Sequence, residues 1–210
     1  MGKTILYVDN RVKYVQSHRL PWLRGAQDAG FDVHVTTLTA GDGTPIEEAG
    51  FTYHCISDDS RSNNPISELR LIARLYGLYR QLQPDLIHHI TLRCVLYGGV
   101  ASIFMPRAAV VNGVTGLGYL FSSKSLKVRL LRAVVLGALR VLRRRDQVYL
   151  FQNPDDEKLF RRHNISMPST GRVIKGSGVD VERFAAQPEP SGPPVILFPA
   201  RMLWHKGVQE

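Results

Sequence analysis

Two basic side chains near the end of the sequence have the chemistry of a phosphate site. Arg201 and Lys206 follow the apolar run 195–198 and lie at the start of the next helical pattern. If that run is a strand, both cations lie in the loop after it, beside a helix N-terminus, where backbone N–H groups favour an anion. A guanidinium and an ammonium there could neutralise a diphosphate without a metal ion. Either residue alone would be an ordinary surface cation, so only the pair indicates such a site.

A second candidate anion site follows the first apolar segment, residues 3–9. Asn10, Ser17, His18 and Arg19 lie near the start of the helical pattern that comes next. An arginine and a hydroxyl beside a helix N-terminus suit an anion. The structural alternative is that Ser17 caps the helix and Arg19 is a solvated surface residue. This loop lacks the glycines of a dinucleotide fingerprint, which argues against an NAD-type site.

A third candidate is the glycine-rich stretch VVNGVTGLGYLF, residues 110–121. It places Asn112, Thr115, Gly116 and two further glycines directly after a strand pattern. Glycines at such a position let the backbone approach a ligand closely. The alternative is a loop that simply needs positive φ angles. Both interpretations stay open on the sequence alone.

The segment KSLKVRLLRAVVLGALRVLRRR, residues 124–145, carries eight Lys and Arg residues and no acid. At helical periodicity five arginines fall within an arc of about 120°, and aliphatic residues cover the opposite side. These arginines are Arg129, Arg132, Arg140, Arg143 and Arg144. One interpretation is a helix that packs on the core with a solvated, arginine-rich face. The other is a membrane-surface helix that attracts anionic lipid headgroups.

The net charge of the 210-residue chain is +9, and its distribution argues against nucleic acid as a partner. Residues 1–105 hold ten basic and ten acidic residues, so the excess lies in residues 106–210, with 17 basic and eight acidic. Most of it belongs to segment 124–145, which has no interleaved aromatic residues of the kind that single-strand binding needs.

The candidate residues need a scaffold, and the rest of the sequence predicts one. Apolar strand patterns at 3–9, 32–38, 51–56, 85–90, 108–114 and 147–153 alternate with helical patterns, among them 16–30 and 64–83. This alternation predicts a doubly wound α/β domain with a parallel sheet covered by helices. Ligands of such sheets gather in the loops at the carboxyl ends of the strands, where the candidates lie.

Composition narrows the class of protein further. With 44% hydrophobic residues the chain can bury a sizeable core. Cys55 and Cys94 are too few for a disulfide framework, and neither has a metal-type spacing. The N-terminal apolar run is too short for a signal peptide. The best candidate for a spanning helix, 86–105, is interrupted by two histidines and Arg93, so no integral membrane segment is predicted.

Several of these stretches resemble the retaining glycosyltransferases of family 4, which have the two-Rossmann-domain GT-B fold. LFPARMLWHKGV, with the upstream GSGVDVERF, is similar to the entry into the second domain of that family. The segments SHRLPWLRGAQDAGFDVHVTT, NPISELRLIARLYGLYRQLQPDLIHHITLRCVLYGGV, VNGVTGLGYLF and FQNPDDEKLF resemble the subgroup that adds sugars, N-acetylgalactosamine among them, to polyprenyl-diphosphate-linked glycans.

The resemblance implies a domain plan and roles for the candidate residues. Residues 1–170 would form the acceptor-binding domain, 171–194 the crossover and linker, and 195–210 the start of a truncated donor domain. Arg201 and Lys206, with Gly178, would hold the donor diphosphate and stabilise charge on the leaving group. Acceptor or cleft contacts would come from two loops, through Asn10, Ser17, His18, Arg19, Asn112, Thr115 and Gly116.

The implied substrates are a nucleotide sugar, such as a UDP-sugar, and a lipid-linked glycan acceptor. No cofactor or metal is implied. Because the family acts at the cytoplasmic leaflet, the resemblance favours the membrane-surface interpretation of segment 124–145. It implies a cytoplasmic protein that is peripheral on the inner face of the plasma membrane.

Two departures from the family pattern limit these expectations. The first loop, NRVKYVQ, lacks the Gly-Gly pair that often contacts the donor phosphates. The downstream acidic motif of the family cannot lie within these 210 residues, so we expect a fragment with little transfer activity by itself. A non-catalytic acceptor-binding module and a sugar-nucleotide epimerase of the same fold remain alternatives. The epimerase would need acid and base groups, and no paired set stands out.

Overall fold

Strands and helices alternate along the chain in the computed structural model. It describes residues 2–57, 64–123, 125–144, 146–179, 181–182, 184–189, 191–200, 202 and 207–208. The strands are β1 (Thr4–Asp9), β2 (Asp32–Thr37), β3 (Thr52–Cys55), β4 (Leu86–Ile90), β5 (Ala109–Val114), β6 (Gln147–Phe151) and β7 (Gly171–Val173). The helices are α1 (Val12–His18), α2 (Leu20–Asp28), α3 (Thr44–Glu47), α4 (Pro65–Leu82), α5 (Leu92–Ser102), α6 (Tyr119–Ser122), α7 (Leu126–Val141) and α8 (Pro154–Arg162).

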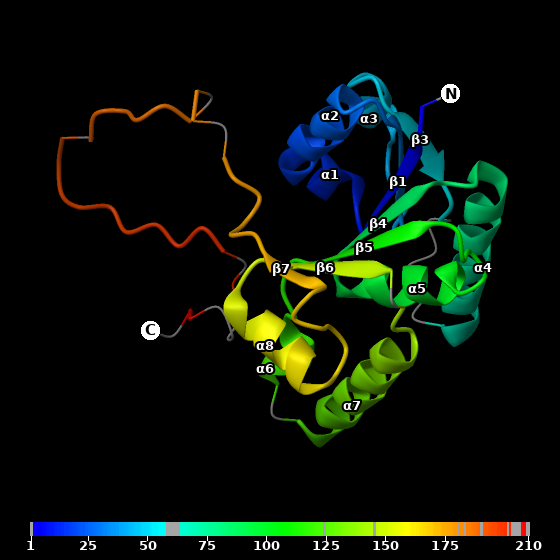
Figure 1. Ribbon diagram of the computed structural model, residues 1–210. Coiled ribbons are helices and arrows are strands. Elements are labelled where there is room, and N and C mark those ends of the chain that lie inside the picture. The colour runs from blue at the N-terminus through cyan, green and yellow to red at the C-terminus, as the bar shows by residue number, and fades with distance from the viewer. Residues whose placement is uncertain are drawn as a thin grey trace.

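All seven strands form one parallel sheet in the order β3-β2-β1-β4-β5-β6-β7. Side chains of α1–α3 form a buried cluster with β1 and β2 on one face, and α4 and α5 pack against the other. Figure 1 shows α5, α7 and α8 on the side opposite α1–α3. The predicted doubly wound α/β fold is therefore confirmed.

The strand order reverses between β1 and β4. The chain moves outward in one direction from β1 to β3, and then returns through α4 to build β4–β7 on the other side. Loops that leave β1 and β4 therefore diverge, which opens a crevice at the carboxyl ends of these strands. Any ligand site of this sheet is expected there.

Most predicted elements agree with the structure, and the differences have physical reasons. All six predicted strands form. The helical pattern 16–30 belongs to two helices that meet at Arg19, and Gly30 follows the second with φ of 86°. The three-residue β7 is too short to leave a pattern. The strand expected at 195–198 is absent from the described residues, where Val195, Ile196 and Leu197 are exposed with no neighbouring strand to pair with.

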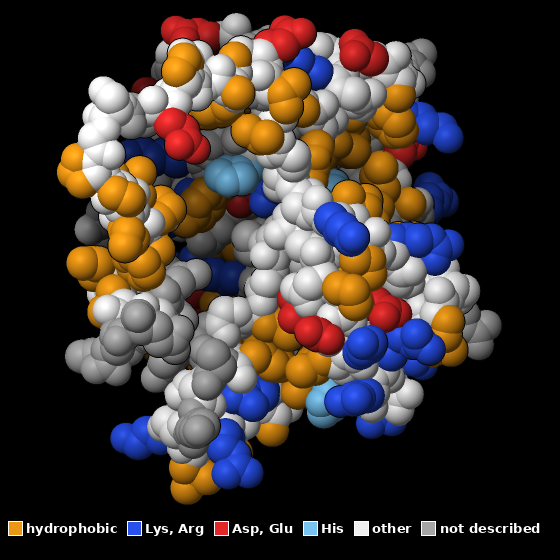
Figure 2. Space-filling model, turned by 90° about the vertical axis from the view of Figure 1, so that its left-hand side faces the viewer, with side chains coloured by type: hydrophobic (Ala, Val, Ile, Leu, Met, Phe, Trp, Pro, Cys, Tyr) orange, Lys and Arg blue, Asp and Glu red, His pale blue; other side chains and the backbone are white. Residues whose placement is uncertain are grey.

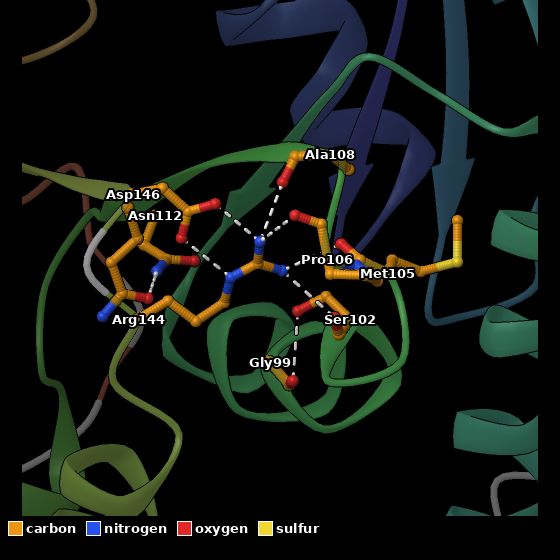
Figure 3. Close-up of polar contacts among 9 residues, drawn as sticks. Gly99, Ser102, Met105, Pro106, Ala108, Asn112, Arg144 and Asp146 are labelled. Carbon is orange, nitrogen blue, oxygen red and sulfur yellow. Dashed lines mark hydrogen bonds and ion pairs between the residues drawn. The ribbon is translucent and has the colours of Figure 1, made fainter.

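Arg144 joins the end of the α7 segment to the loop between α5 and β5. Its guanidinium donates to the carbonyl oxygens of Ser102 and Met105 (3.1 Å each), Ala108 (3.2 Å) and Pro106 (3.3 Å). The same group makes a bidentate pair with Asp146, at 3.0 Å and 2.6 Å. In Figure 3 these acceptors converge on the guanidinium from several sides. All of its N–H groups are therefore used to fix the backbone of this loop.

The tandem histidines of β4 are both buried and point to opposite faces of the sheet. The His89 ring lies between the Tyr79 hydroxyl and the Asn112 amide oxygen, each 2.9 Å away. Burial lowers the pKa of His89 to about 4 and that of His88 to about 3. Both rings are therefore neutral in the folded protein at physiological pH.

We predict that Arg144→Ala lowers the free energy of unfolding by about 2–4 kcal/mol, because four carbonyl groups and a carboxylate lose a charged donor. Arg144→Lys should lose much of the same stability, since an ammonium cannot reach all of these acceptors. Urea unfolding measures both. Arg107→Ala, an exposed change in the same loop, is the control, and equal losses in Arg107→Ala and Arg144→Ala would contradict the assignment.

We also predict that stability falls as the pH drops below about 6.5. The unfolded chain protonates both histidines at their ordinary pKa, whereas the folded chain binds these protons only near pH 3–4. Each histidine then contributes a slope of about 1.4 kcal/mol per pH unit. Urea unfolding between pH 7.5 and 5 should show this slope, and His89→Gln should reduce it by one histidine's share. A flat profile in the parent protein, or an unchanged slope in His89→Gln, would disprove the prediction.

Candidate functional site

The crevice at the end of β1 contains a buried ion pair. The Arg19 Nε lies 3.2 Å from a carboxylate oxygen of Asp9, and both side chains are almost fully buried. Burial raises the pKa of the Asp9 carboxyl, while the Asn10 amide and the Arg19 guanidinium oppose that rise. The pair holds the loop after β1 against the junction of α1 and α2.

Arg19 also reaches two other parts of the crevice. Its Nη1 donates to the Ser177 hydroxyl at 2.7 Å, so the first loop contacts the segment that follows β7. Its guanidinium carbon lies 4.6 Å from the centre of the Trp22 ring. Trp22 is in turn stacked on His88, with ring centroids 5.8 Å apart and the planes parallel within 1°. Arg19 thus orients the aromatic wall of the crevice.

A cavity of about 270 Å³ lies beside this stack. Its walls come from the carboxyl halves of β1, β4, β5 and β6, from α2 and from the residues after β7. They include Tyr7, Trp22, His88, Gly113, Thr115, Leu150, Gln152, Ile174 and Gly176. Most of this lining is apolar or aromatic, and a few polar groups interrupt it, as is typical of sites for small organic ligands.

His88 supplies the buried polar group of the cavity. Its Nε2 has no hydrogen-bond partner among the described residues. A Cβ at Gly113 would lie 3.3 Å from that atom, so glycine keeps the space in front of it open. Because the ring is neutral, Nε2 can donate or accept a hydrogen bond, depending on the tautomer. The geometry suits a hydroxyl group of a ligand.

The first turn of α5, directly after β4, carries a second charged group that sequence reasoning missed. Arg93 donates to Glu68 at 2.8 Å and to the Asn10 side chain at 3.4 Å, and its guanidinium lies 5.1 Å from the Tyr97 ring centre. The residue before this helix, Thr91, has φ of 84°, which is a strained conformation for threonine. Such strain is common at functional sites. In the sequence, only the position of Arg93 soon after the strand pattern 85–90 could have indicated that this residue belongs to the site.

The structure brings some of the predicted cleft residues together and separates others. Thr115 lines the cavity, and Gly116 follows it with φ of 138°. Asn10 lies in the crevice beside Arg93. Ser17 donates to the Lys13 carbonyl oxygen within its own helix and contacts the exposed His18. Among the described residues, the Ser17 and His18 side chains therefore contact only residues of their own helix.

Asn112 lies inside the sheet rather than in the cavity. It bonds to His89 through its amide oxygen and donates to Gln147 at 3.2 Å through its amide nitrogen. Gln147 continues the chain of hydrogen bonds to the Tyr149 hydroxyl at 3.3 Å. Asn112 therefore satisfies buried polar groups across β4, β5 and β6.

Only one of the predicted donor-phosphate residues belongs to the described part of the chain. Arg201 and Lys206 lie outside the described residues. Gly178 is described and has φ of 75°, and Gly176, which lines the cavity, has φ of 70°. The turn at 176–178 thus needs its glycines, and Ser177 between them holds the contact with Arg19.

The arginines of segment 124–145 fall into two groups. Arg132 donates to the carbonyl oxygens of Leu120 and Ser123, and Arg143 donates to that of Asn164. With Arg144, these residues fix neighbouring backbone. Arg129 and Arg140 are exposed on α7. α7 buries Val135, Leu136 and Leu139, whereas Leu126, Leu130, Leu131, Val134 and Val141 are each more than half exposed.

The part of the chain that the structure describes contains neither a cluster of metal ligands nor a membrane-spanning helix. No three His, Cys, Asp or Glu side chains among these residues converge on a position that could hold a metal ion. None of their helices combines the length and hydropathy that crossing a bilayer requires.

Comparison with known proteins identifies the family and the fold. A family model described as "Glycosyl transferase 4-like" matches residues 4–153. The N,N'-diacetylbacillosaminyl-diphospho-undecaprenol alpha-1,3-N-acetylgalactosaminyltransferase of Campylobacter jejuni is 22% identical over an alignment of 205 residues. The match covers 91% of this chain and 54% of that protein.

Solved structures agree on the fold. Anabaena HepE in complex with UDP aligns with a TM-score of 0.59 and 17% identity, over 88% of this chain and 47% of that one. A UDP-N-acetylglucosamine 2-epimerase aligns with a TM-score of 0.61 and 15% identity, over 92% of this chain and 53% of that one.

The chain spans about half the length of these proteins. The fold alone is shared by transferases and epimerases, so it does not distinguish these two activities. The family model does, because it matches most of the sequence, from β1 to the start of α8. The chain belongs to the glycosyl transferase 4-like family.

Proposed function

We propose that this chain provides the acceptor-binding half of a glycosyltransferase. The enzyme would move a sugar from a nucleotide sugar to a polyprenyl-diphosphate-linked glycan, with retention of configuration. The observation that carries the proposal is the cavity at the carboxyl ends of β1, β4, β5 and β6, in a chain of this family. The Campylobacter jejuni relative is named for transfer to an undecaprenyl-diphosphate-linked sugar, which supports this acceptor class.

The lining of the cavity suits a sugar ring. Tyr7, Trp22 and Leu150 offer apolar surface, against which the C–H face of a pyranose packs. Thr115 and the unpartnered His88 Nε2 can hydrogen-bond to hydroxyl groups at the edge of the ring. This arrangement orients an acceptor and excludes water from around it.

The donor side of the reaction is assigned to the segment after β7. Arg201 and Lys206, with the Gly178 turn, would bind the diphosphate of the nucleotide sugar and stabilise the charge that develops on the leaving group. The Anabaena HepE structure is a complex with UDP, which is consistent with a UDP-sugar donor. In this scheme the diphosphate is neutralised by side chains and backbone, with no metal.

α7 would place the protein on the inner face of the plasma membrane, where a lipid-linked acceptor lies. Its exposed side presents Leu126, Leu130, Val134 and Val141 to solvent, and Arg129 and Arg140 flank this stripe. An exposed apolar stripe bordered by arginines is typical of a helix that lies in a membrane interface. Arg144 is left out of this surface because its donors are used within the fold.

We predict that Thr115→Val weakens acceptor binding about tenfold, because the variant keeps the shape of the side chain and removes one hydrogen bond. A water-soluble farnesyl-diphosphate-linked N-acetylhexosamine serves as the ligand, and isothermal titration calorimetry measures the Kd. Thr52→Val, the same change at an exposed position of the far edge strand β3, is the matched control. If the parent protein does not bind this ligand, or if both variants bind it as tightly as the parent, the cavity is not the acceptor site.

A second prediction concerns the membrane. Leu130→Glu combined with Val134→Glu should lower binding to phosphatidylglycerol vesicles at least tenfold in a co-sedimentation assay, because the variant places charge on the inserting stripe. Ile66→Glu combined with Leu69→Glu on α4 adds the same charge at two other exposed apolar positions and should leave vesicle binding unchanged. Equal binding by all three proteins would rule out α7 as the contact.

A further inference from the structure

The turn 176–178, where the chain leaves the sheet after β7, borders the cavity beside Trp22, which we call the acceptor cavity. Ile174 and Gly176 supply part of its wall. The Ile174 N–H donates to the Phe151 carbonyl oxygen at 2.8 Å, so the start of this wall is anchored on β6. Figure 1 shows the chain running away from the sheet after β7. Figure 2 views the molecule from the side of this segment and shows a hollow in that face, bordered by hydrophobic side chains. The cavity wall is thus also the point where the chain leaves the domain.

Ser177, in the middle of this turn, accepts hydrogen bonds from two parts of the domain. The Arg19 Nη1 donates to its hydroxyl oxygen at 2.7 Å, and the Gln152 side-chain nitrogen donates to the same oxygen at 3.5 Å. Both donors are connected with the acceptor cavity. Gln152 lines it, and Arg19 stacks on Trp22, which lines it as well. One hydroxyl group therefore ties the turn to two walls of the cavity.

The stronger of these two donors is held in a fixed position. Asp9 pairs with the Arg19 Nε at 3.2 Å, and both side chains are almost fully buried. The Nη1 of the same guanidinium is thereby presented to the turn by a rigid part of the domain. A charged donor also makes a stronger hydrogen bond than a neutral one. The position of the turn therefore depends mainly on whether the Ser177 hydroxyl meets Arg19.

The backbone on both sides of Ser177 can change its conformation easily. Gly176 and Gly178 have φ of 70° and 75°, and glycine populates positive and negative φ about equally well. Two such residues can absorb the change in φ and ψ that moves a short segment as a hinge. The turn therefore has two accessible states. In the docked state Ser177 bonds to Arg19, and in the released state the cavity loses the wall that Ile174 and Gly176 supply.

We propose that Ser177 is a positioning residue that couples the acceptor cavity to the part of the chain after the turn. A ligand in the cavity contacts Ile174 and Gly176 only in the docked state, so it shifts the equilibrium toward that state. The coupling is reciprocal, because whatever favours docking also strengthens ligand binding. This inference rests on the proposed function, which assigns the cavity to the acceptor and the segment after β7 to the donor. An occupied acceptor cavity then fixes the place where the donor side begins.

Limited digestion of the whole chain with trypsin tests the coupling at Lys175, an exposed residue beside the turn. Cleavage there follows the population of the released state. Saturating farnesyl-diphosphate-linked N-acetylhexosamine should slow the appearance of the peptide that ends at Lys175 about tenfold. Without ligand, Ser177→Ala should speed this cleavage about fivefold, as expected for the loss of one hydrogen bond. Ser191→Ala, the same change at an exposed serine farther along the segment, should be cleaved like the parent protein.

Isothermal titration calorimetry with the same ligand separates the possible failures. Ligand that binds without slowing cleavage at Lys175 overturns the coupling and leaves the acceptor cavity as the binding site. No detectable binding overturns the proposed function, and the coupling with it. If the ligand merely shields Lys175, cleavage slows on binding, but the unliganded parent and Ser177→Ala proteins are cleaved at the same rate, which also overturns the role of Ser177.

Discussion

The buried ion pair between Asp9 and Arg19 is the interaction on which the candidate site depends. Asp9 is the last residue of the interior strand β1, and Arg19 lies at the junction of α1 and α2. Leaving a buried charge without its partner lowers the free energy of unfolding by about 3–5 kcal/mol. Replacing either residue alone would therefore displace the other. Arg19 then positions Trp22 by stacking and Ser177 by a hydrogen bond. One ion pair thereby aligns the first loop, the aromatic wall of the cavity and the segment after β7.

The parallel sheet explains why the cavity and the buried polar network can coexist in neighbouring strands. Successive residues of a strand point to opposite faces, so His88 and His89 serve different roles although they are adjacent. His89 meets Tyr79 and Asn112 on the face that α4 and α5 cover, and its hydrogen bonds are satisfied there. His88 points to the other face, where Trp22 covers one side of its ring and Nε2 remains open to the cavity. The site thus lies beside a sheet face on which the polar side chains of His89, Asn112 and Gln147 are paired.

The fold could be predicted from the sequence to a large extent, and the site only in part. Alternating apolar strands and amphipathic helices determine a parallel α/β sheet, because each element must bury its apolar side. The loops at the strand ends were correctly located for the same reason. Individual side chains could not be assigned, since Asn112 and Thr115 stand three residues apart in one glycine-rich stretch and yet lie in a buried network and in the cavity. Arg93 was missed because its partner Glu68 is 25 residues away.

α7 illustrates why a helical wheel alone does not reveal which side of a helix is buried. Its aliphatic residues form a wide surface, of which only Val135, Leu136 and Leu139 pack on the core. Five others, Leu126, Leu130, Leu131, Val134 and Val141, face solvent. Arg132, Arg143 and Arg144 bind backbone of the neighbouring loops and so set the rotation and depth of the segment. Three arginines of segment 124–145 thus hold α7 in this orientation. Arg129 and Arg140, for which the described structure provides no partner, are the ones that remain for an anion, and they border the apolar stripe. An apolar surface on a helix is ordinarily buried. α7 is instead fixed with such a surface toward solvent, beside Arg129 and Arg140. It is therefore suited to a partner that offers both hydrocarbon and phosphate.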